Sequence, residues 1–562
     1  MEPFSNPRPL PPNACGLVPL GGLGEIGKNM LCLECRDQIL VVDAGLSFPT
    51  EEQPGVDLII PDMTYLTDRA EQVLAVVLTH GHEDHVGAVP FLLKQIDVPV
   101  YGTPMTLGIL RNKLEEHGLA ETARLREIRA GETLNLGPFD LRFIRCAHSI
   151  VDGVGLGIET PAGRILHTGD FKLDPTPVDD QPTDLAAFAD FARNGVDLLL
   201  ADSTNVERPG YTLSEREVGT ALDDIMREAP GRVVVACFSS NVHRFQQVVN
   251  TAVRYDRKLN VLGRSMVKNM RTAQELGYLA VPEQLWLRDT QWHRLPPDRQ
   301  VMMTTGSQGE PRSALARAAV GDHPELALGP GDTVVISARV IPGNERRIGN
   351  MINHFFRLGC HVHYERVSEI HVSGHAAREE LKVIHSLVRP RHFIPVHGEP
   401  RHLVLHGQLA RELGLAEEAV FVLTNGDRVV MEAGRVRREG RVPSGSVLVD
   451  GKGVGDVGHV VLRDRRHLAE DGMVIAVVGV DHHTGEILSG PDLTLRGVTD
   501  ETEVPALAEG ARRALLDALA GLTAEGAGDI PLLQDTVRSA LKRYFKHAVK
   551  RFPMILPLIM EI

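Results

Sequence analysis

The sequence contains few cysteines and has no long run of apolar residues. Six cysteines in 562 residues are too few for a disulfide-stabilised scaffold and are typical of a reducing compartment. The longest apolar stretch near the end, Phe552 to Met560, is interrupted by two prolines and is shorter than the roughly 18 residues of a membrane-spanning helix. The first residues lack the basic and apolar regions of a secretory signal. We therefore expect a cytoplasmic protein without a membrane partner.

An excess of basic residues is also absent. The chain has 60 Lys and Arg residues against 74 Asp and Glu residues, which gives a net charge of −14. Because the overall charge has the wrong sign for nucleic-acid binding, RNA or DNA would have to be met by a local basic channel. A hydrophobic share of 43% excludes wholesale disorder. At about 150 residues per domain, the length predicts three or four domains.

The order of apolar and polar segments predicts an inserted domain. In the first part, apolar runs end on polar turns, which is typical of strands whose carboxyl ends carry a site. From Ser214 strands alternate regularly with helices, which predicts parallel βαβ units over residues 214–367. Histidine-rich motifs flank this segment, so we expect a first domain of residues 1–213 and 368–450. A glycine-rich linker over 451–467 and a small α+β domain over 468–562 would follow.

The most informative motif is Thr79-His80-Gly81-His82-Glu83-Asp84-His85, which follows a predicted strand. In extended backbone, His80 and His82 point the same way and can hold one ion. Asp84 and His85 come where the chain turns into a helix and can face a second ion. Imidazole and carboxylate ligands together suit Zn²⁺ or Mn²⁺.

One cluster cannot complete two coordination shells, so further ligands are expected at other strand ends. The candidates are His148, Asp170 and His397. With them, His80, His82 and His148 would hold one ion, and Asp84, His85 and His397 would hold the other. Asp170 would bridge the two ions. Asp43, also at a strand end, is expected to orient ligand histidines.

These motifs carry a resemblance to a known family. HGHEDH followed by single His, Asp and His ligands resembles the metallo-β-lactamase superfamily. Asp202 in ADSTN, His375 in HVSGHA and His397 in IPVHGE resemble the three motifs of its β-CASP branch. PLGGLGEIGKN, CFSSNVHRFQQ, TTGSQGEP and HVSGHAAREELK are similar to the bacterial ribonuclease J family. The resemblance covers about Gly16 to Asp450, and the tail fits more loosely.

The resemblance implies both a fold and an activity. The fold would be a metallo-β-lactamase αββα sandwich with an inserted α/β β-CASP domain and a small C-terminal α+β domain. The activity would be 5′→3′ exonuclease action on 5′-monophosphorylated RNA, with additional endonuclease activity, in RNA maturation and decay. A hydroxide shared by two ions would attack the phosphodiester. His375 would protonate the leaving oxygen, and Asp202 would orient His375 or a metal ligand.

An exonuclease of this polarity needs a pocket for the terminal phosphate, and two segments are candidates. The first consists of His371, Val372, Ser373, Gly374 and His375, which offer hydroxyl, imidazole and backbone donors. The second consists of Ser239, Ser240 and Asn241, which open a helix after a strand, where anions bind. A simple helix N-cap is the alternative interpretation of this second segment.

Two further features follow from the resemblance. It indicates a structural Ca²⁺ site made of the Gly55 carbonyl, Asp57 and Asp450. It also implies a homo-oligomer, a dimer or tetramer, formed through the C-terminal domain. The last helix carries an apolar stripe beside a basic face. Packing of the stripe in the core, with the basic face in solvent, is the usual interpretation, and contact with another subunit is the alternative.

Three other functions stay open at this point. A lactonase or thioesterase of the same superfamily would have the same metal core, but it would need neither the inserted domain nor His375. A nuclease acting mainly on DNA would share every motif, because recognition of the 2′-hydroxyl cannot be read from them. A non-catalytic RNA-binding scaffold would have lost metal ligands, whereas every ligand position is present here.

Overall fold

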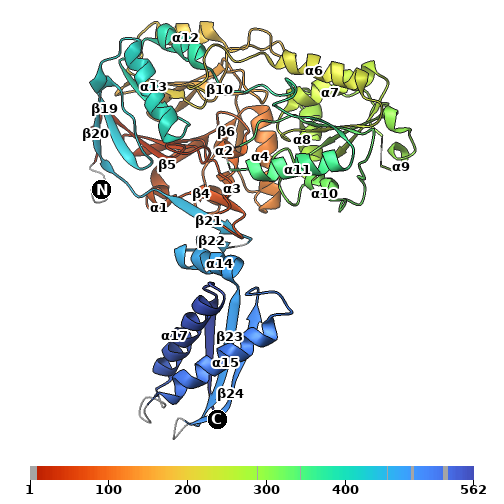
Figure 1. The fold of residues 1–562 in the computed structure, drawn as a ribbon. Coiled ribbons are helices and arrows are strands. Elements are labelled where there is room, and N and C mark those ends of the chain that lie inside the picture. Colours follow the sequence, from red (N-terminus) through yellow and green to blue (C-terminus); the bar gives the residue numbers. More distant parts are fainter. Residues whose placement is uncertain (1–8, 288, 342, 452, 482–485, 523–528) are drawn as a thin grey trace. The chain divides into compact units, whose positions relative to one another are not determined.

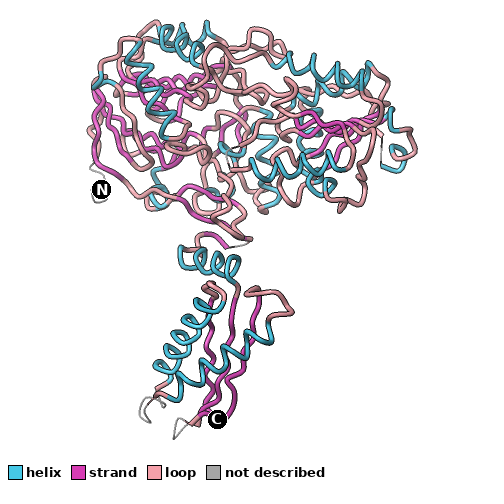
Figure 2. Tube along the Cα trace, in the orientation of Figure 1, coloured by secondary structure: helices cyan, strands magenta, loops and turns pink. Residues whose placement is uncertain are grey.

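The structure is a computed structural model that describes residues 9–287, 289–341, 343–451, 453–481, 486–522 and 529–562. The chain forms two compact units. The larger unit consists of Met1–Phe48 and Ile59–Val447, and the smaller consists of Pro49–Leu58 and Leu448–Ile562. Figures 1 and 2 show the elements of each unit.

Two β-sheets form the first part of the larger unit. One sheet has eight strands in the order β20-β19-β1-β2-β3-β5-β6-β7, and the other has six strands in the order β18-β12-β11-β10-β9-β8. The eight are β20 (Arg435–Arg441), β19 (Asp427–Glu432), β1 (Ala14–Gly21), β2 (Met30–Cys35), β3 (Gln38–Val42), β5 (Val73–Val77), β6 (Val100–Gly102) and β7 (Leu125–Glu127). The six are β18 (His392–Val396), β12 (Leu198–Asp202), β11 (Gly163–His167), β10 (Val154–Thr160), β9 (Phe139–Arg145) and β8 (Thr133–Leu136).

The hydrophobic core explains why these sheets stack. Leu33 and Leu40 of the first sheet belong to the same buried cluster as Phe143 and Leu156 of the second. The opposite face of the second sheet, with Leu199, packs against helices α5, α12 and α13. Helix α4 packs against β6 and β7 of the first sheet. The helices here are α1 (Thr64–Thr67), α2 (Glu83–Val86), α3 (Val89–Leu93), α4 (Pro104–Glu116), α5 (Leu185–Ala192), α12 (Arg378–Val388) and α13 (Pro400–Glu412).

A five-stranded parallel sheet lies between α5 and α12 in the chain, in the order β14-β15-β13-β16-β17. Side chains of β13 alternate, so that Val233 and Val235 pack with helices α6, α7 and α8, whereas Val234 and Ala236 pack with α10 and α11. The strands are β13 (Val233–Ala236), β14 (Lys258–Leu262), β15 (Gln300–Thr304), β16 (Thr333–Ile336) and β17 (His361–His363). The helices are α6 (Glu215–Glu228), α7 (Val242–Arg254), α8 (Arg264–Glu275), α9 (Asp289–Trp292), α10 (Ala314–Ala319) and α11 (Glu345–Arg357).

The fully buried Arg244 joins this parallel sheet to the chain that returns from it. Its guanidinium pairs with Glu215 at 2.6 Å and donates to the Ile370 carbonyl at 2.8 Å. It also donates to the carbonyl of Ser337, just beyond β16, at 3.1 Å. A buried guanidinium is tolerated only when its charge and its donors are all partnered. Arg244 therefore fixes the residues that lead into the predicted phosphate segment at 371–375.

The smaller unit contains a three-stranded sheet in the order β24-β23-β25, with helices α15 and α17 covering one face. Strand β25 was not predicted, because Pro553 and Pro557 argue against a strand. β25 is an edge strand of this sheet, where proline is tolerated. The elements are β23 (Met473–Val480), β24 (Ile487–Arg496), β25 (Met554–Glu561), α15 (Val504–Ala520) and α17 (Ile530–Ala548).

The predicted linker contains more regular structure than its glycines indicate. Within 451–467 the structure has strand β22 (Gly453–Val454), which pairs with β21 (Ser446–Asp450), and the start of α14 (His459–Asp471). The glycines end at Gly458, and α14 itself contains neither glycine nor proline, so nothing in it opposes a helix. Strand β4 (Leu58–Pro61) completes the strands that the structure describes.

The predicted α/β fold class is confirmed by these sheets and helices, and the exact domain bounds stay predictions. None of the helices in the described ranges is long and apolar enough to span a membrane.

We expect Arg244→Ala to lower the free energy of unfolding by about 3–5 kcal/mol, because it leaves the buried Glu215 carboxylate without a partner. Arg254→Ala on the same helix is the control, since Arg254 is 66% exposed and pairs with Asp223 at the surface. Its loss should cost less than about 1 kcal/mol. Urea unfolding followed by circular dichroism measures both variants. Equal midpoints would contradict the role given to Arg244.

Candidate metal centre

The side chains of the predicted metal set gather where strands of the two sheets end. His80 follows β5, and His82, Asp84 and His85 lie at the start of the short helix α2. His148 follows β9, Asp170 follows β11, and His397 follows β18. The structure therefore brings together ligands that lie more than 300 residues apart in the sequence.

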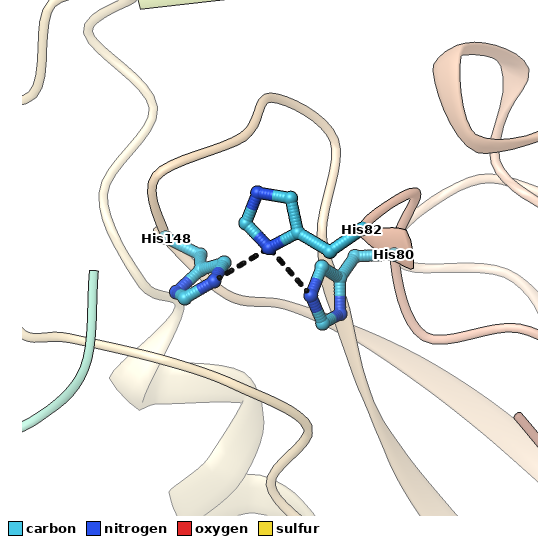
Figure 3. A group of neighbouring side chains, drawn as sticks. All are labelled: His80, His82 and His148. Carbon is cyan, nitrogen blue, oxygen red and sulfur yellow. Dashed lines mark hydrogen bonds between the residues drawn. The ribbon is translucent and has the colours of Figure 1, made fainter. Parts of the chain in front are cut away.

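Three histidines form the first group (Figure 3), and their ring nitrogens face one another. His82 Nδ1 lies 3.1 Å from His80 Nε2 and 3.1 Å from His148 Nε2. Ligand atoms about 2 Å from a tetrahedral ion lie about 3.3 Å apart. The spacing of these three nitrogens fits a divalent ion.

The second group consists of Asp84, His85, Asp170 and His397. His397 Nε2 lies 3.2 Å from Asp84 Oδ2, and His85 Nε2 lies 3.3 Å from Asp170 Oδ2. The same Asp170 oxygen is 3.7 Å from His80 Nε2 and 3.8 Å from His148 Nε2. Asp170 therefore faces both groups, as a bridging ligand would.

An aspartate–threonine pair orients two of these histidines. Asp43 Oδ2 accepts a hydrogen bond from His85 Nδ1 at 2.7 Å and another from the Thr79 hydroxyl at 2.8 Å. That hydroxyl lies 3.1 Å from His80 Nδ1 and can accept its proton. With Nδ1 engaged in both rings, Nε2 is left for an ion. Asp43 lies where the sequence predicted it, whereas the hydrogen-bonding role of Thr79 was not predicted.

A second aspartate–threonine pair lies on the other side of the site. Asp202 Oδ2 accepts from His375 Nδ1 at 2.7 Å, and its Oδ1 accepts from the Thr204 hydroxyl at 2.8 Å. That hydroxyl lies 2.9 Å from His397 Nδ1. Asp202 thus orients His375 directly and His397 through Thr204. The motif Asp202-Ser203-Thr204 contained this signal, but only its aspartate was singled out.

The ionisation of these groups suits a metal centre. Burial holds the pKa of His80 and His148 well below the usual range and lowers that of His82 to about 4, so these rings keep free lone pairs. Burial also disfavours charge on His397, but Asp170, Asp202 and Asp84 outweigh it and raise its pKa to about 10. The raised pKa of His397 reflects the surrounding carboxylate charge, which a divalent cation would neutralise.

The segment 371–375 lies against this centre. His148 Nδ1 donates to the Gly374 carbonyl at 2.7 Å. A Cβ atom at Gly374 would lie 2.6 Å from the His148 ring, so only glycine allows this approach. The Ser373 hydroxyl accepts from Asn205 Nδ2 at 2.7 Å, and the sequence gave no reason to single out Asn205. His371 is half-buried, whereas the Val372 side chain packs in the core.

The segment 239–241 has a capping role. Asn241 Oδ1 accepts from the Arg244 amide at 3.0 Å and so caps α7, as the simpler interpretation held. Ser239 and Ser240 are half-buried, and the Ser239 carbonyl accepts from Asn269 of α8 at 3.1 Å. No hydrogen bond between described residues joins this segment to 371–375.

The glycine-rich loop Gly22–Gly27 also borders the centre. The Gly24 amide donates to the Gly398 carbonyl at 2.9 Å, next to His397. Asn29, just after the loop, donates through Nδ2 to the Asp84 carbonyl at 3.1 Å and lies 3.0 Å from His85 Nε2. Sequence reasoning missed Asn29. Strand β2 rather than a helix follows the loop, which excludes a dinucleotide-binding turn.

The three groups predicted to hold Ca²⁺ lie in the smaller unit. The Gly451 amide donates to Asp57 Oδ2 at 2.8 Å. The Arg465 guanidinium pairs with Asp450 at 2.5 Å and donates to the Pro54 carbonyl, next to Gly55, at 3.1 Å. The guanidinium is thus the cation that the structure has beside Asp450, and the calcium ion stays a prediction.

Four family models match the chain. The metallo-beta-lactamase superfamily model covers residues 29–211, and the ribonuclease J beta-CASP domain covers 230–355. The Zn-dependent metallo-hydrolase RNA specificity domain covers 360–423, and the ribonuclease J C-terminal domain covers 460–562.

Curated relatives match nearly the whole chain. Ribonuclease J 1 of Streptococcus pyogenes is 42% identical, and the match covers 98% of each chain. Ribonuclease J of Thermus thermophilus is 44% identical over 97% of this chain and 95% of its own. A solved Enterococcus faecalis protein of unknown function, 17% identical, covers 74% of this chain and all of its own with a TM-score of 0.52, a likeness of fold alone. From these matches, the chain belongs to the ribonuclease J family.

Proposed function

We propose that this protein is a two-metal-ion ribonuclease that degrades RNA from a 5′-monophosphate end in the 5′→3′ direction and also cuts internally. The observation that carries the proposal is the shared position of Asp170 between two ligand groups, with His375 beside them. Family membership makes the chain a metal-dependent nuclease. The RNA specificity model over 360–423 and the names of the relatives favour RNA as substrate, and we propose a cytoplasmic location.

The predicted metal ligands and His375 each have a part in this proposal. His80, His82 and His148 would hold one ion, Asp84, His85 and His397 the other, and Asp170 would contact both. Two divalent ions, Zn²⁺ or Mn²⁺, would supply an activated water and neutralise charge on the phosphodiester. His375, with Nδ1 held by Asp202 at 2.7 Å, would present Nε2 to the leaving oxygen and give it a proton. The product would keep a 5′-phosphate.

The terminal phosphate would bind beside the centre. The Ser373 hydroxyl lies within hydrogen-bonding distance of the His375 amide, at 3.2 Å, which ties a phosphate donor to the proposed acid. Ser239 and Ser240, at the start of α7, would add donors from the inserted domain. Gly374, His371 and the backbone of Val372 would complete the pocket, while Asn241 serves mainly as the helix cap.

A homo-oligomer would form through the smaller unit. The face of its sheet away from α15 and α17 carries Leu556, Leu558 and Met560, which are 44%, 44% and 49% exposed. Ile475 and Val477 of β23 pair in register with Leu556 and Leu558, so the apolar side chains form one continuous face. A second copy of this chain would cover it, because the same apolar face on both subunits is complementary to itself.

The function is tested on one RNA prepared with a 5′-monophosphate, a 5′-triphosphate or a 5′-hydroxyl end, with Mn²⁺, Zn²⁺ or a chelator. We expect metal-dependent release of mononucleotides, fastest from the monophosphate end. Internal fragments irrespective of the end would remove the exonuclease proposal. A lactone, a thioester or single-stranded DNA cleaved faster than RNA would favour the corresponding rival function.

The division of roles between ligand and acid is tested by two variants. Asp84→Ala removes a proposed ligand, so we expect it to lose one equivalent of metal and nearly all cleavage. His375→Ala removes only the proposed acid, so its metal content should stay at two ions while cleavage falls about 10²–10⁴-fold. Elemental analysis and single-turnover cleavage measure both effects. Loss of metal from His375→Ala would make His375 a ligand instead.

The oligomer is tested by Leu558→Glu, which places a charge on the apolar sheet face. We expect the mass in solution, measured by light scattering after size exclusion, to fall to 61.5 kDa. Leu532→Glu on α17 is the matched control, because Leu532 is 43% exposed but lies away from this face, and its mass should not change. A wild-type protein of monomeric mass would contradict the oligomer.

A further inference from the structure

A basic region surrounds His371, at the start of the predicted phosphate segment. Burial together with nearby positive charge holds the pKa of His371 well below its usual range. The burial disfavours any charge at this position, whereas the positive charge disfavours a proton and favours an anion. The basic side chains responsible are Arg244, Arg339, Arg208 and Lys172.

Three of these four cations already have carboxylate partners. Lys172 is buried and pairs with Asp174 at 3.2 Å, and Arg244 is buried and pairs with Glu215 at 2.6 Å. Arg208 lies 4.0 Å from Glu365. Arg339 differs from them, because no carboxylate of the described residues forms an ion pair with it and its side chain is exposed to solvent.

The position of Arg339 follows from the parallel sheet. It comes three residues after the end of β16 (Thr333–Ile336), at the edge where the carboxyl ends of the five strands meet and where such sheets bind ligands. The Ser337 hydroxyl donates to the Ile370 carbonyl at 2.7 Å, which holds this strand end against the chain that continues into His371.

One buried side chain, Asn205, connects Arg339 to the phosphate segment. Arg339 Nη1 donates to Asn205 Oδ1 at 3.2 Å. The amide nitrogen of Asn205 donates to the Ser373 hydroxyl at 2.7 Å and to the His375 carbonyl at 3.0 Å. Among the described residues, Nη2 and Nε of Arg339 have no hydrogen-bond partner, and two hydrogen bonds through Asn205 link the guanidinium to the Ser373 hydroxyl.

We propose that Arg339 supplies the positive charge that recognises the 5′-terminal phosphate of the RNA, and that Asn205 holds it beside Ser373. This inference rests on the proposed function and deepens it. A planar guanidinium with two remaining donors suits a phosphate monoester, which carries more charge than an internal phosphodiester and offers three terminal oxygens. Arg339 would therefore discriminate ends rather than strengthen RNA binding uniformly.

The test measures binding of adenosine 5′-monophosphate and of adenosine to the metal-loaded full chain by calorimetry. We expect wild type to prefer the monophosphate by about tenfold or more, as a charge-assisted contact provides. Arg339→Gln keeps a donor for Asn205 but removes the charge, so it should lose most of this preference. Arg339→Lys keeps the charge and should retain part of it. Arg357→Ala, an exposed arginine on α11, should match wild type.

Cleavage of 5′-hydroxyl RNA at internal sites gives the second readout, which we expect Arg339→Gln to leave within about twofold of wild type. An unchanged preference in Arg339→Gln, an equal loss in internal cutting, or a wild type without preference would overturn the assignment. If the preference for the monophosphate depends on Arg339 but RNA yields only internal fragments, the role of Arg339 is supported and the exonuclease proposal is wrong. If degradation depends on the 5′ end while Arg339→Gln keeps the preference for the monophosphate, the exonuclease proposal is supported and the role of Arg339 is wrong.

Discussion

A buried carboxylate, Asp170, faces five histidine rings, and the rest of the site depends on this interaction. Its oxygens lie 3.3–3.8 Å from ring nitrogens of His80, His85, His148, His375 and His397. Removing a carboxylate from water costs several kcal/mol of free energy unless a positive charge lies next to it. Either protons on the histidines or metal ions can supply that charge. The strand ends that converge on Asp170 therefore form a site where positive charge is needed, which suits a cation-binding centre.

Hydrogen bonds hold the orientation of four histidines around Asp170. Asp43 with Thr79 fixes His85 and His80, and Asp202 with Thr204 fixes His375 and His397. The two pairs have the same construction, an aspartate at a strand end whose carboxylate holds one ring directly and a second ring through a threonine hydroxyl. Asp43 and His397 themselves have φ values of 61° and 53°. Such backbone strain costs on the order of 1–3 kcal/mol and persists where the surrounding structure fixes it.

The sequence predicted the parts of this centre that lie in short motifs or at the ends of apolar strands. His80 to His85 are adjacent in the chain, and Asp43, His148, Asp170 and His397 each follow an apolar run, so local patterns sufficed. Asn205 and Asn29 were missed because their partners lie far away in the chain, as with Asn205 and Ser373, 168 residues apart. Strand β25, which contains Pro557 and directly follows Pro553, was missed because proline is tolerated in a strand only at a sheet edge. Helix α14 was not predicted, because the glycines before it indicated a linker.

The inserted parallel sheet provides positive charge that the metal-ligand side chains do not. The centre contains buried carboxylates and the whole chain carries a charge of −14, so a terminal phosphate that binds beside the centre needs a cation nearby. Arg244 brings the sheet edge against the chain at Ile370, and Asn205 joins that edge to Ser373 and His375. The end of β16 thereby carries Arg339 to the border of the metal site without placing a basic side chain among the ligands. A cation beside Ser373 can meet the phosphate, whereas a cation at Asp170 would compete with the metal ions. In the proposed function, the guanidinium on the parallel sheet and the metal ligands on the other two sheets would act in one site without competing.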